Sequence, residues 1–246
     1  LGFSWQGLDT ASSLVNGILV ARDDNLWTAI EGKGVYFQTK NGVNYGLPVE
    51  RLGGVSAYRL VEGHDGVIYA ATDNGLYAIS SHDVVNLFAG TELNGIIARY
   101  VSLRSDGAVL VATDRGAWQY KNQQFIAVTP EFQSQPTTLI EQDSSGALWI
   151  GTSNHGIARY DGDHIEILDS KSGLSDNRIL AWFQDKQNNI WIGTNGGITR
   201  LRDASISSMT ESDGLKGDYT RTVLALDDHR FWVGSSNGLS LIAKNG

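Results

Sequence analysis

The sequence has 246 residues, a formal net charge of −8, 41% hydrophobic residues and no cysteine. This apolar share supports a folded core and excludes a disordered chain. The acidic balance, with no block of Lys or Arg, argues against nucleic acid or an anionic membrane surface as a partner. The lack of cysteine excludes disulfides and thiolate metal sites. No apolar run reaches the roughly 18 residues of a transmembrane helix.

A glycine recurs every 40 or 41 residues along the whole chain. About seven residues before each glycine there is a large apolar residue, followed two positions later by Ala or Gly. A hydroxyl comes next in five of the six repeats, with Ile30 as the exception. The periodic glycines are Gly34, Gly75, Gly116, Gly156, Gly197 and Gly238. A period of this length is typical of a repeat architecture.

The strands within one repeat are clearest around residues 137–168. The sequence predicts a strand over 137–142, a tight turn over 143–146, and a continuously apolar strand over 147–152. A short hairpin at 153–156 then leads to strands over 157–161 and 164–168. Since the apolar strand has no polar face, both of its faces should be covered. Four antiparallel strands per 41 residues predict an all-β protein, a β-propeller of six four-stranded blades.

The last repeat stops eight residues after Gly238, before its outer strand. Residues 2–6 have the pattern of that missing strand, so we expect them to complete the last blade. This would close one ring over residues 1–246 and remove an open sheet edge. The alternative is that the six blades belong to a longer array.

Residues 173–201 resemble the two-component-regulator propeller repeat. The similarity rests on Gly173-Leu174, Asn177, Asp185, the run from Ile190 to Thr194, and Gly197 with Arg200. The resemblance implies a periplasmic sensor region of a bacterial histidine kinase or diguanylate cyclase. It also implies a small-molecule ligand such as an oligosaccharide, a receptor homodimer, and membrane attachment only through segments outside these residues.

Several short motifs are explained better by the repeat than by chemistry. Gly234 to Gly238 fits the G-x-S-x-G elbow but falls on a repeat hairpin, whereas a nucleophile needs a strand-to-helix turn. Asp143 to Trp149 resembles the turn of sialidases, and Asp161-Gly162-Asp163 lacks the further ligands of a calcium loop. The five histidines form no zinc pattern. We therefore expect no catalytic set, no metal and no cofactor.

Function is expected at the hairpins after the apolar strands and at the connections between blades, where polar residues vary on a constant framework. Amides, Arg and Tyr there suit a sugar through planar hydrogen bonds and ring stacking. Trp118 and Trp182 lie off the repeated Trp position and are expected to pack between blades. The candidate ligand-binding residues are Asp114, Arg115, Asn154, His155, Asn177, Arg178, Tyr219 and Arg221; the wider set includes Glu31, Asp73 and Asn16.

Three functions follow from these features. The first, which we favour, is a non-catalytic ligand-sensing or interaction domain of a signalling receptor. The second is a propeller lyase of the streptogramin or glycan type, with His155 and Asp114 as the one base–acid pair we nominate. The third is a scaffold for protein partners.

Overall fold

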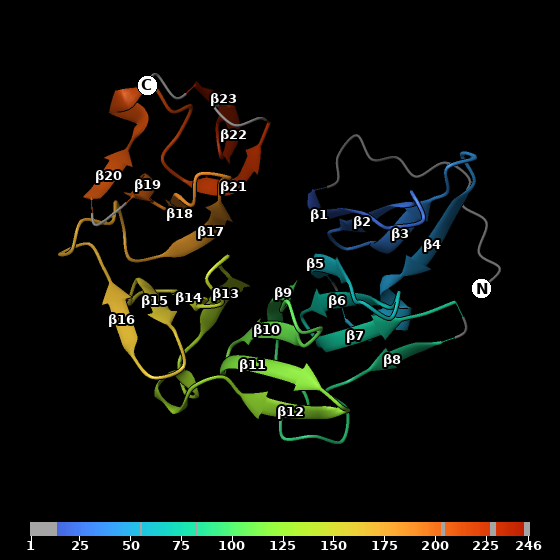
Figure 1. The fold of residues 1–246 in the computed structure, drawn as a ribbon. Coiled ribbons are helices and arrows are strands. Elements are labelled where there is room, and N and C mark those ends of the chain that lie inside the picture. The colour runs from blue at the N-terminus through green and yellow to red at the C-terminus, as the bar shows by residue number, and fades with distance from the viewer. Residues whose placement is uncertain (1–13, 55, 82, 203–204, 227–229, 244–246) are drawn as a thin grey trace. The chain divides into compact units, whose positions relative to one another are not determined.

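The computed structural model describes residues 14–54, 56–81, 83–202, 205–226 and 230–243 (Figure 1). It divides into two compact units, unit 1 (Leu1–Pro136) and unit 2 (Thr137–Gly246). The prediction of one closed domain over 1–246, and of an outer strand from residues 2–6, stays a prediction because residues 1–13 lie outside the described part.

Unit 1 contains three antiparallel sheets of four strands, each in sequence order. Blade 1 consists of β1 (Val15–Val20), β2 (Leu26–Ile30), β3 (Gly34–Gln38) and β4 (Asn44–Pro48). Blade 2 consists of β5 (Ala57–Glu62), β6 (Ile68–Thr72), β7 (Gly75–Ile79) and β8 (Val84–Asn86). Blade 3 consists of β9 (Ala98–Leu103), β10 (Val109–Thr113), β11 (Gly116–Lys121) and β12 (Gln124–Ala127).

Unit 2 repeats this arrangement. Blade 4 consists of β13 (Thr137–Gln142), β14 (Leu148–Thr152), β15 (Ile157–Tyr160) and β16 (Ile165–Leu168). Blade 5 consists of β17 (Ile179–Gln184), β18 (Ile190–Thr194), β19 (Gly197–Arg202) and β20 (Ser205–Met209). Blade 6 has three described strands, β21 (Thr220–Ala225), β22 (Arg230–Ser235) and β23 (Gly238–Ala243). Three short 3₁₀ turns follow β4, β12 and β20: η1 (Val49–Leu52), η2 (Pro130–Phe132) and η3 (Glu211–Asp213).

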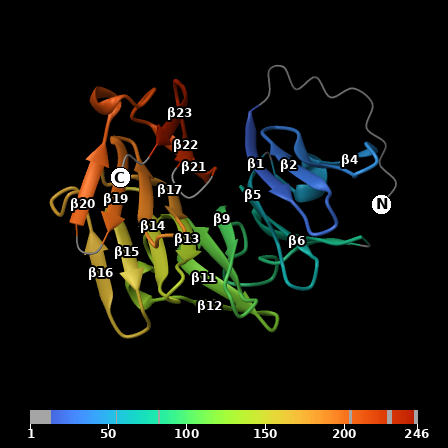
Figure 2. The same cartoon turned by 45° about the horizontal axis from the view of Figure 1, so that its top comes forward.

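The first strands of successive blades lie side by side within each unit. β1, β5 and β9 are neighbours in unit 1, and β13, β17 and β21 are neighbours in unit 2 (Figures 1 and 2). The repeat, the strand order and the all-β content confirm the predicted class of six propeller blades.

The second strands are buried on both faces, as their composition predicted. Every residue of β6, β10, β14 and β18 is buried. In blades 4 and 5 the small residue after the Trp position faces the first strand of the next blade. A Cβ on Gly151 would lie 2.8 Å from Cγ2 of Ile179, and one on Gly193 would lie 2.7 Å from Cγ2 of Thr220. At these two positions the neighbouring sheets approach so closely that even the Cβ of alanine would force a neighbour to shift.

The repeated hydroxyl closes the hairpin that follows it. Oγ1 of Thr72, Thr113 and Thr152 donates to the carbonyl oxygen of the next periodic glycine at 2.8 Å in each case. Ser235 does the same to Gly238 at 3.1 Å. Ser236, the central serine of the G-x-S-x-G match, lies on the hairpin between β22 and β23. The motif is therefore part of the repeat hairpin.

The aspartate at the turn between first and second strands supports the Trp of its own blade. Oδ1 of Asp143 accepts hydrogen bonds from the backbone N–H of Ser145 at 2.9 Å and of Ala147 at 3.0 Å. Oδ2 accepts from Nε1 of Trp149 at 2.9 Å. In blade 5, Asp185 makes the same bond to Trp191 at 3.1 Å. The sialidase-like turn is thus structural, as expected.

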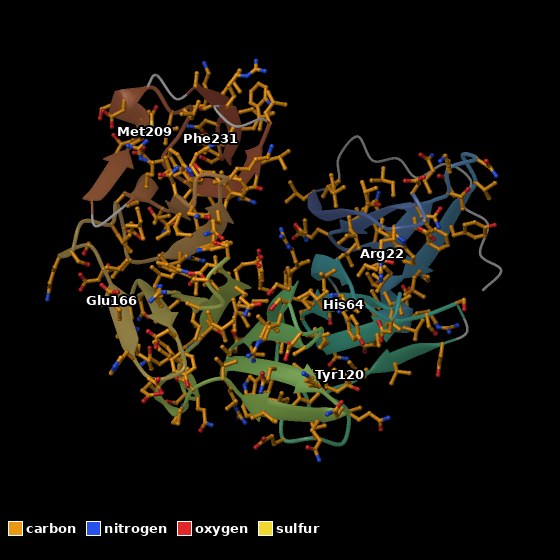
Figure 3. The ribbon with its side chains drawn as sticks, viewed as in Figure 1. Arg22, His64, Tyr120, Glu166, Met209 and Phe231 are labelled. Carbon is orange, nitrogen blue, oxygen red and sulfur yellow. The ribbon has the colours of Figure 1, made fainter. Side chains whose placement is uncertain are left out.

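Two pairs of blades are also joined at these turns. The backbone N–H of Arg22 in blade 1 donates to Oε2 of Glu62 in blade 2 at 2.7 Å, and its guanidinium donates to the carbonyls of Gly63 and His64. Figure 3 labels Arg22 and His64 in their adjacent blades. In unit 2, the N–H of Ser144 donates to Oε1 of Gln184 at 2.7 Å. The two links occupy the same place in the repeat.

Trp118 packs between blades 2 and 3, as expected. It is buried in one cluster with Leu76 and Phe88 of the preceding segment, and its Nε1 donates to the carbonyl of Arg115 at 2.8 Å. Trp182 lies on β17 and is half-buried. A core cluster of unit 2 contains Trp191 and Phe231, and Met209 packs against it. Figure 3 labels Met209 and Phe231.

Candidate functional site

One end of every blade carries both the hairpin between its second and third strands and the connection into its first strand. This follows from antiparallel strand order, because strands one and three begin where strands two and four end. We call it the hairpin end, and the opposite end the turn end. The hairpins and connections at which function was expected thus share one end of each blade.

Each first strand has a β-bulge near its start, at the hairpin end. The register shifts by one residue at the same place in all six described sheets. A bulge leaves one residue unpaired and redirects its side chain. The unpaired residues, in chain order, are Asn16, Tyr58, Arg99, Thr138, Leu180 and Arg221.

In unit 1, the bulged Arg99 meets an acidic hairpin residue, and a second hairpin carboxylate lies near the bulged Tyr58. Nε of Arg99 forms an ion pair with Oδ1 of Asp114 on the hairpin of its own blade. Oδ2 of Asp73, on the hairpin of blade 2, accepts a hydrogen bond from the backbone N–H of Ser56 at 3.2 Å. This bond fixes the Asp73 carboxylate beside the start of β5, two residues from Tyr58.

The pKa of Tyr58 is shifted by burial and by the charged residues around it. Burial raises the pKa of its phenol above the ordinary value of 10.0, and the carboxylates of Asp73, Glu31 and Asp114 raise it further, whereas Arg99 lowers it. The phenol is therefore neutral at physiological pH and can donate a hydrogen bond. We call Glu31, Tyr58, Asp73, Arg99 and Asp114 the Tyr58 cluster; its residues come from three consecutive blades of unit 1.

A second aromatic residue lies next to this cluster in sequence. The guanidinium carbon of Arg59 on β5 is 4.7 Å from the ring centre of Tyr100 on β9, a cation–π arrangement. Arg59 and Arg99 are exposed, and Tyr58 and Tyr100 are half-buried. Together these residues offer aromatic faces, guanidinium donors and carboxylate acceptors at one end of three adjoining blades.

The structure places two of the predicted residues in unit 1. Asp114 is a member of the Tyr58 cluster through its ion pair with Arg99. Arg115 is exposed on the same hairpin, where its backbone N–H donates to Oγ1 of Thr113 at 3.0 Å and its carbonyl accepts from Trp118.

The other six predicted residues lie at hairpin ends of unit 2. Asn154 and His155 are exposed, and the N–H of His155 donates to Oγ1 of Thr152 at 2.8 Å. Arg178 is exposed, whereas Asn177 serves the framework: its carbonyl accepts from Gly156 N–H at 2.9 Å and its Oδ1 from Ser170 N–H at 2.7 Å.

Tyr219 and Arg221 form a pair of their own. The guanidinium carbon of Arg221 is 5.1 Å from the ring centre of Tyr219, and Arg221 is exposed while Tyr219 is half-buried. Arg221 occupies the bulged position of blade 6 that Tyr58 and Arg99 occupy in blades 2 and 3. Whether the eight predicted residues bind a ligand stays a prediction.

Sequence reasoning nominated Arg221 but missed Tyr58, Arg59, Arg99 and Tyr100. A signal for two of them was present: aligned by repeat, Tyr58 and Arg99 fall in the column of Arg221, which varies from repeat to repeat. The bulge that makes this column special is not visible in the residue pattern.

Within the described residues, no three His, Asp or Glu side chains are grouped as metal ligands would be. Among the same residues, no helix is long and apolar enough to cross a membrane.

These sheets, with doubly covered second strands and bulged first strands, define a β-propeller protein. Residues 173–196 match the family described as Two component regulator propeller. The chain therefore carries the two-component-regulator propeller repeat, as its sequence predicted. No curated protein matches the chain significantly in sequence.

Two solved extracellular domains are similar in fold. The extracellular domain of the putative one component system BT4673 from B. thetaiotaomicron is 17% identical with a TM-score of 0.67, over 95% of this chain and 42% of that chain. The extracellular domain of the putative hybrid two component system BT3049 from the same organism is 15% identical with a TM-score of 0.61, over 98% of this chain and 41% of that chain. The chain thus spans about two fifths of the length of these domains.

Lyases share the fold as well. A streptogramin B lyase structure is 16% identical with a TM-score of 0.75, over 94% of this chain and 79% of the lyase. A catalytically inactive virginiamycin B lyase from Staphylococcus aureus, solved with Quinupristin, is 12% identical with a TM-score of 0.70, over 98% of this chain and 87% of the lyase. Solved structures similar to this chain therefore include both extracellular domains of putative one- and two-component systems and lyases.

Proposed function

We propose that this chain is a non-catalytic ligand-sensing propeller of a bacterial signalling receptor, placed on the periplasmic side of the membrane. The family match at residues 173–196 and the fold shared with extracellular domains of putative one- and two-component systems support this proposal. Binding would shift an existing equilibrium between receptor states, which requires a ligand with different affinities for the two states.

The Tyr58 cluster is the single observation that carries the proposal. It combines a half-buried phenol, an exposed guanidinium and three carboxylates on loops of a rigid scaffold. Tyr rings stack on sugar faces, while carboxylate and guanidinium groups hydrogen-bond to hydroxyls. A carbohydrate fragment is therefore the ligand class that we propose for the cluster.

Replacing Arg99 by alanine is expected to weaken carbohydrate binding by about 10-fold to 100-fold. The variant loses a charge-assisted donor to the ligand and releases Asp114 from its ion pair. The measurement is calorimetric titration with a panel of neutral, amino and acidic oligosaccharides, first with the unaltered domain to find the one that binds.

Arg104→Ala is the matched control, because it removes the same charge from the turn end of the same blade, where Arg104 donates to Gln119 at 3.1 Å. Equal loss of affinity in the two variants would show a general charge effect and refute a site at the hairpin end. No binding by any member of the panel would refute the carbohydrate class.

A lyase is the second candidate, favoured by the TM-score of 0.75 to the streptogramin B lyase. His155 is its proposed base, since it is exposed on a hairpin of blade 4. Asp114, its nominated partner, is already paired with Arg99 within unit 1. That ion pair disfavours a catalytic role for Asp114, because its carboxylate is already engaged by the Arg99 guanidinium.

Replacing His155 by alanine is expected to leave folding unchanged, since its side chain is exposed. Turnover of streptogramin B antibiotics and of glycans is followed by mass spectrometry with the unaltered chain and with His155→Ala. Turnover that disappears in the variant would establish the lyase and replace the sensor proposal.

A further inference from the structure

Asn-Gly pairs recur along this chain, and at such a pair the asparagine side chain can react with its own backbone, because glycine has no side chain to hinder the attack. The sequence contains seven pairs, six of them within the described residues. The structure separates these pairs by what holds the side chain and the following glycine. The asparagines are Asn16, Asn41, Asn74, Asn94, Asn195, Asn237 and Asn245.

The pair Asn94–Gly95 lies in the connection between β8 and β9, and both residues are exposed. Among the described residues, no hydrogen bond reaches the Asn94 side chain or either polar group of the peptide between Asn94 and Gly95. A Cβ on Gly95, whose φ is 75°, would meet no atom within 4 Å. One hydrogen bond closes the turn, from the N–H of Ile96 to the carbonyl of Leu93 at 3.0 Å. This peptide can therefore rotate towards the attack geometry without losing a hydrogen bond of its own.

Two other pairs are restrained through the asparagine side chain. Nδ2 of Asn16 donates to the carbonyl of Ala57 at 3.1 Å, and Nδ2 of Asn74 donates to the hydroxyl of Tyr77 at 3.3 Å. Gly75, which follows Asn74, is buried as well. Each of these side chains must give up its bond before Cγ can approach the next backbone nitrogen, so reaction there requires local opening.

Three further pairs are restrained through the glycine. The N–H of Gly42 donates to the carbonyl of Thr39 at 2.8 Å, and the N–H of Gly196 donates to Oγ1 of Thr194 at 3.0 Å. Gly238 begins β23, and its carbonyl accepts the hydroxyl of its hairpin at 3.1 Å. At these pairs the peptide that must rotate is held by the turn or the strand.

We propose that Asn94 converts spontaneously to aspartate and isoaspartate in the folded protein, whereas the other described Asn-Gly pairs react only when their segments open. In the first step the backbone nitrogen of Gly95 bonds to Cγ of Asn94. The amide nitrogen leaves as ammonia with the proton of the Gly95 N–H, and a succinimide ring remains. Water then adds to one of the two ring carbonyls and opens the ring to aspartate or isoaspartate. The reaction needs no oxidant and no metal.

The product puts a new carboxylate at the hairpin end of blade 3. Asn94 lies in the connection that leads to the bulged Arg99, and the carbonyl of Ile97 in this connection accepts from the N–H of Asp114 at 3.3 Å. Isoaspartate also lengthens the main chain of the turn by one methylene group. The modification therefore changes both the charge and the path of this connection. The inference goes beyond the proposed ligand sensing and does not depend on it.

Peptide mapping by mass spectrometry tests the proposal, because conversion of an amide to an acid changes the mass of its peptide. The protein is incubated at mildly alkaline pH, once folded and once in urea, and an isoaspartate-specific methyltransferase assay identifies the second product. In urea all pairs should react at similar rates. In the folded protein Asn94 should react within about 10-fold of its rate in urea, whereas Asn74 and Asn195 should react at least about 100-fold more slowly than in urea.

Asn94→Gln should abolish the fast product, because glutamine would have to close a larger ring, and it should leave stability unchanged because the side chain is exposed. Asn41→Gln, at another exposed Asn-Gly pair, is the matched control and should leave the fast product in place. Protection of Asn94 equal to that of Asn74 in the folded protein would overturn the proposal. Equal rates at all pairs of the folded protein, or a fast product that persists in Asn94→Gln, would overturn it as well.

Discussion

Replacing Gly156 by alanine is expected to lower the free energy of unfolding by about 3–5 kcal/mol. Gly156 has a φ of 78°, where a side chain is strained, and a Cβ there would overlap the carbonyl oxygen of Leu168 on the outer strand of its own blade. The outer strand must move for the variant to fold, so β16 would detach first. Urea unfolding at neutral pH, monitored by circular dichroism, measures the change.

Gly162→Ala in the same blade is the matched control, because its φ of 107° is also positive and no atom lies within 4 Å of the added Cβ. Gly162→Ala should lower the free energy of unfolding by about 1–2 kcal/mol, because it adds backbone strain and no steric overlap. Equal losses at the two positions would contradict the view that the outer strand imposes the periodic glycine. Gly238 in blade 6 meets only Cβ of Lys216, at 4.0 Å, which agrees with a blade of three described strands.

Replacing Asp143 by alanine is the second large effect, with an expected loss of about 2–4 kcal/mol at pH 7. The carboxylate accepts two backbone hydrogen bonds, one from the Ser145 hydroxyl at 2.6 Å and one from the Trp149 indole at 2.9 Å. Alanine leaves the turn donors and the indole N–H without this acceptor. Urea unfolding followed by tryptophan fluorescence gives the difference.

The loss should depend on pH. Burial alone would raise the pKa of Asp143, but hydrogen bonds from Ser145, Trp149 and Ala147 outweigh it and hold the pKa below its ordinary value of 3.8. A lowered folded-state pKa stabilises the protein above the pKa of the unfolded chain, about 3.9, and this contribution is lost as pH falls through the folded-state value. The stability gap between Asp143→Ala and the unaltered chain should therefore shrink towards pH 3.

The control for this prediction is Asp163→Ala, which removes an exposed carboxylate from a neighbouring turn of blade 4. It should change stability by less than about 0.5 kcal/mol at either pH. A gap at Asp143 that is constant between pH 7 and pH 3 would contradict a role for its ionised form.

The periodic features of the fold were predictable because each has a local cause that recurs. The positive φ at the hairpin requires glycine, the close approach of the next blade requires a small residue after Trp, and the turn requires an aspartate acceptor. The hydroxyl after the small residue recurs because it donates a hydrogen bond to the carbonyl of the periodic glycine. Ile30 lacks that bond, and blade 1 still forms its hairpin.

The candidate site was predictable only in outline. Hairpin positions such as Asp114 follow from the repeat, but the partner of Asp114 is Arg99, and no residue pattern shows that β9 bulges there. The apolar alternation of a first strand is the same with and without a bulge, so a one-residue shift that turns Arg99 towards the hairpin comes from strand geometry.

Hydrogen exchange with and without the binding oligosaccharide tests the central claim most directly. The claim predicts that saturating ligand slows exchange at the hairpin ends of blades 1–3, in separate short peptides containing Tyr58, Asp73, Arg99 or Asp114 and not Asp106, while the ligand stays chemically intact. Protection confined to the turn ends around Asp65 and Asp106, or conversion of the ligand to a product of different mass, would contradict a sensing site at the Tyr58 cluster.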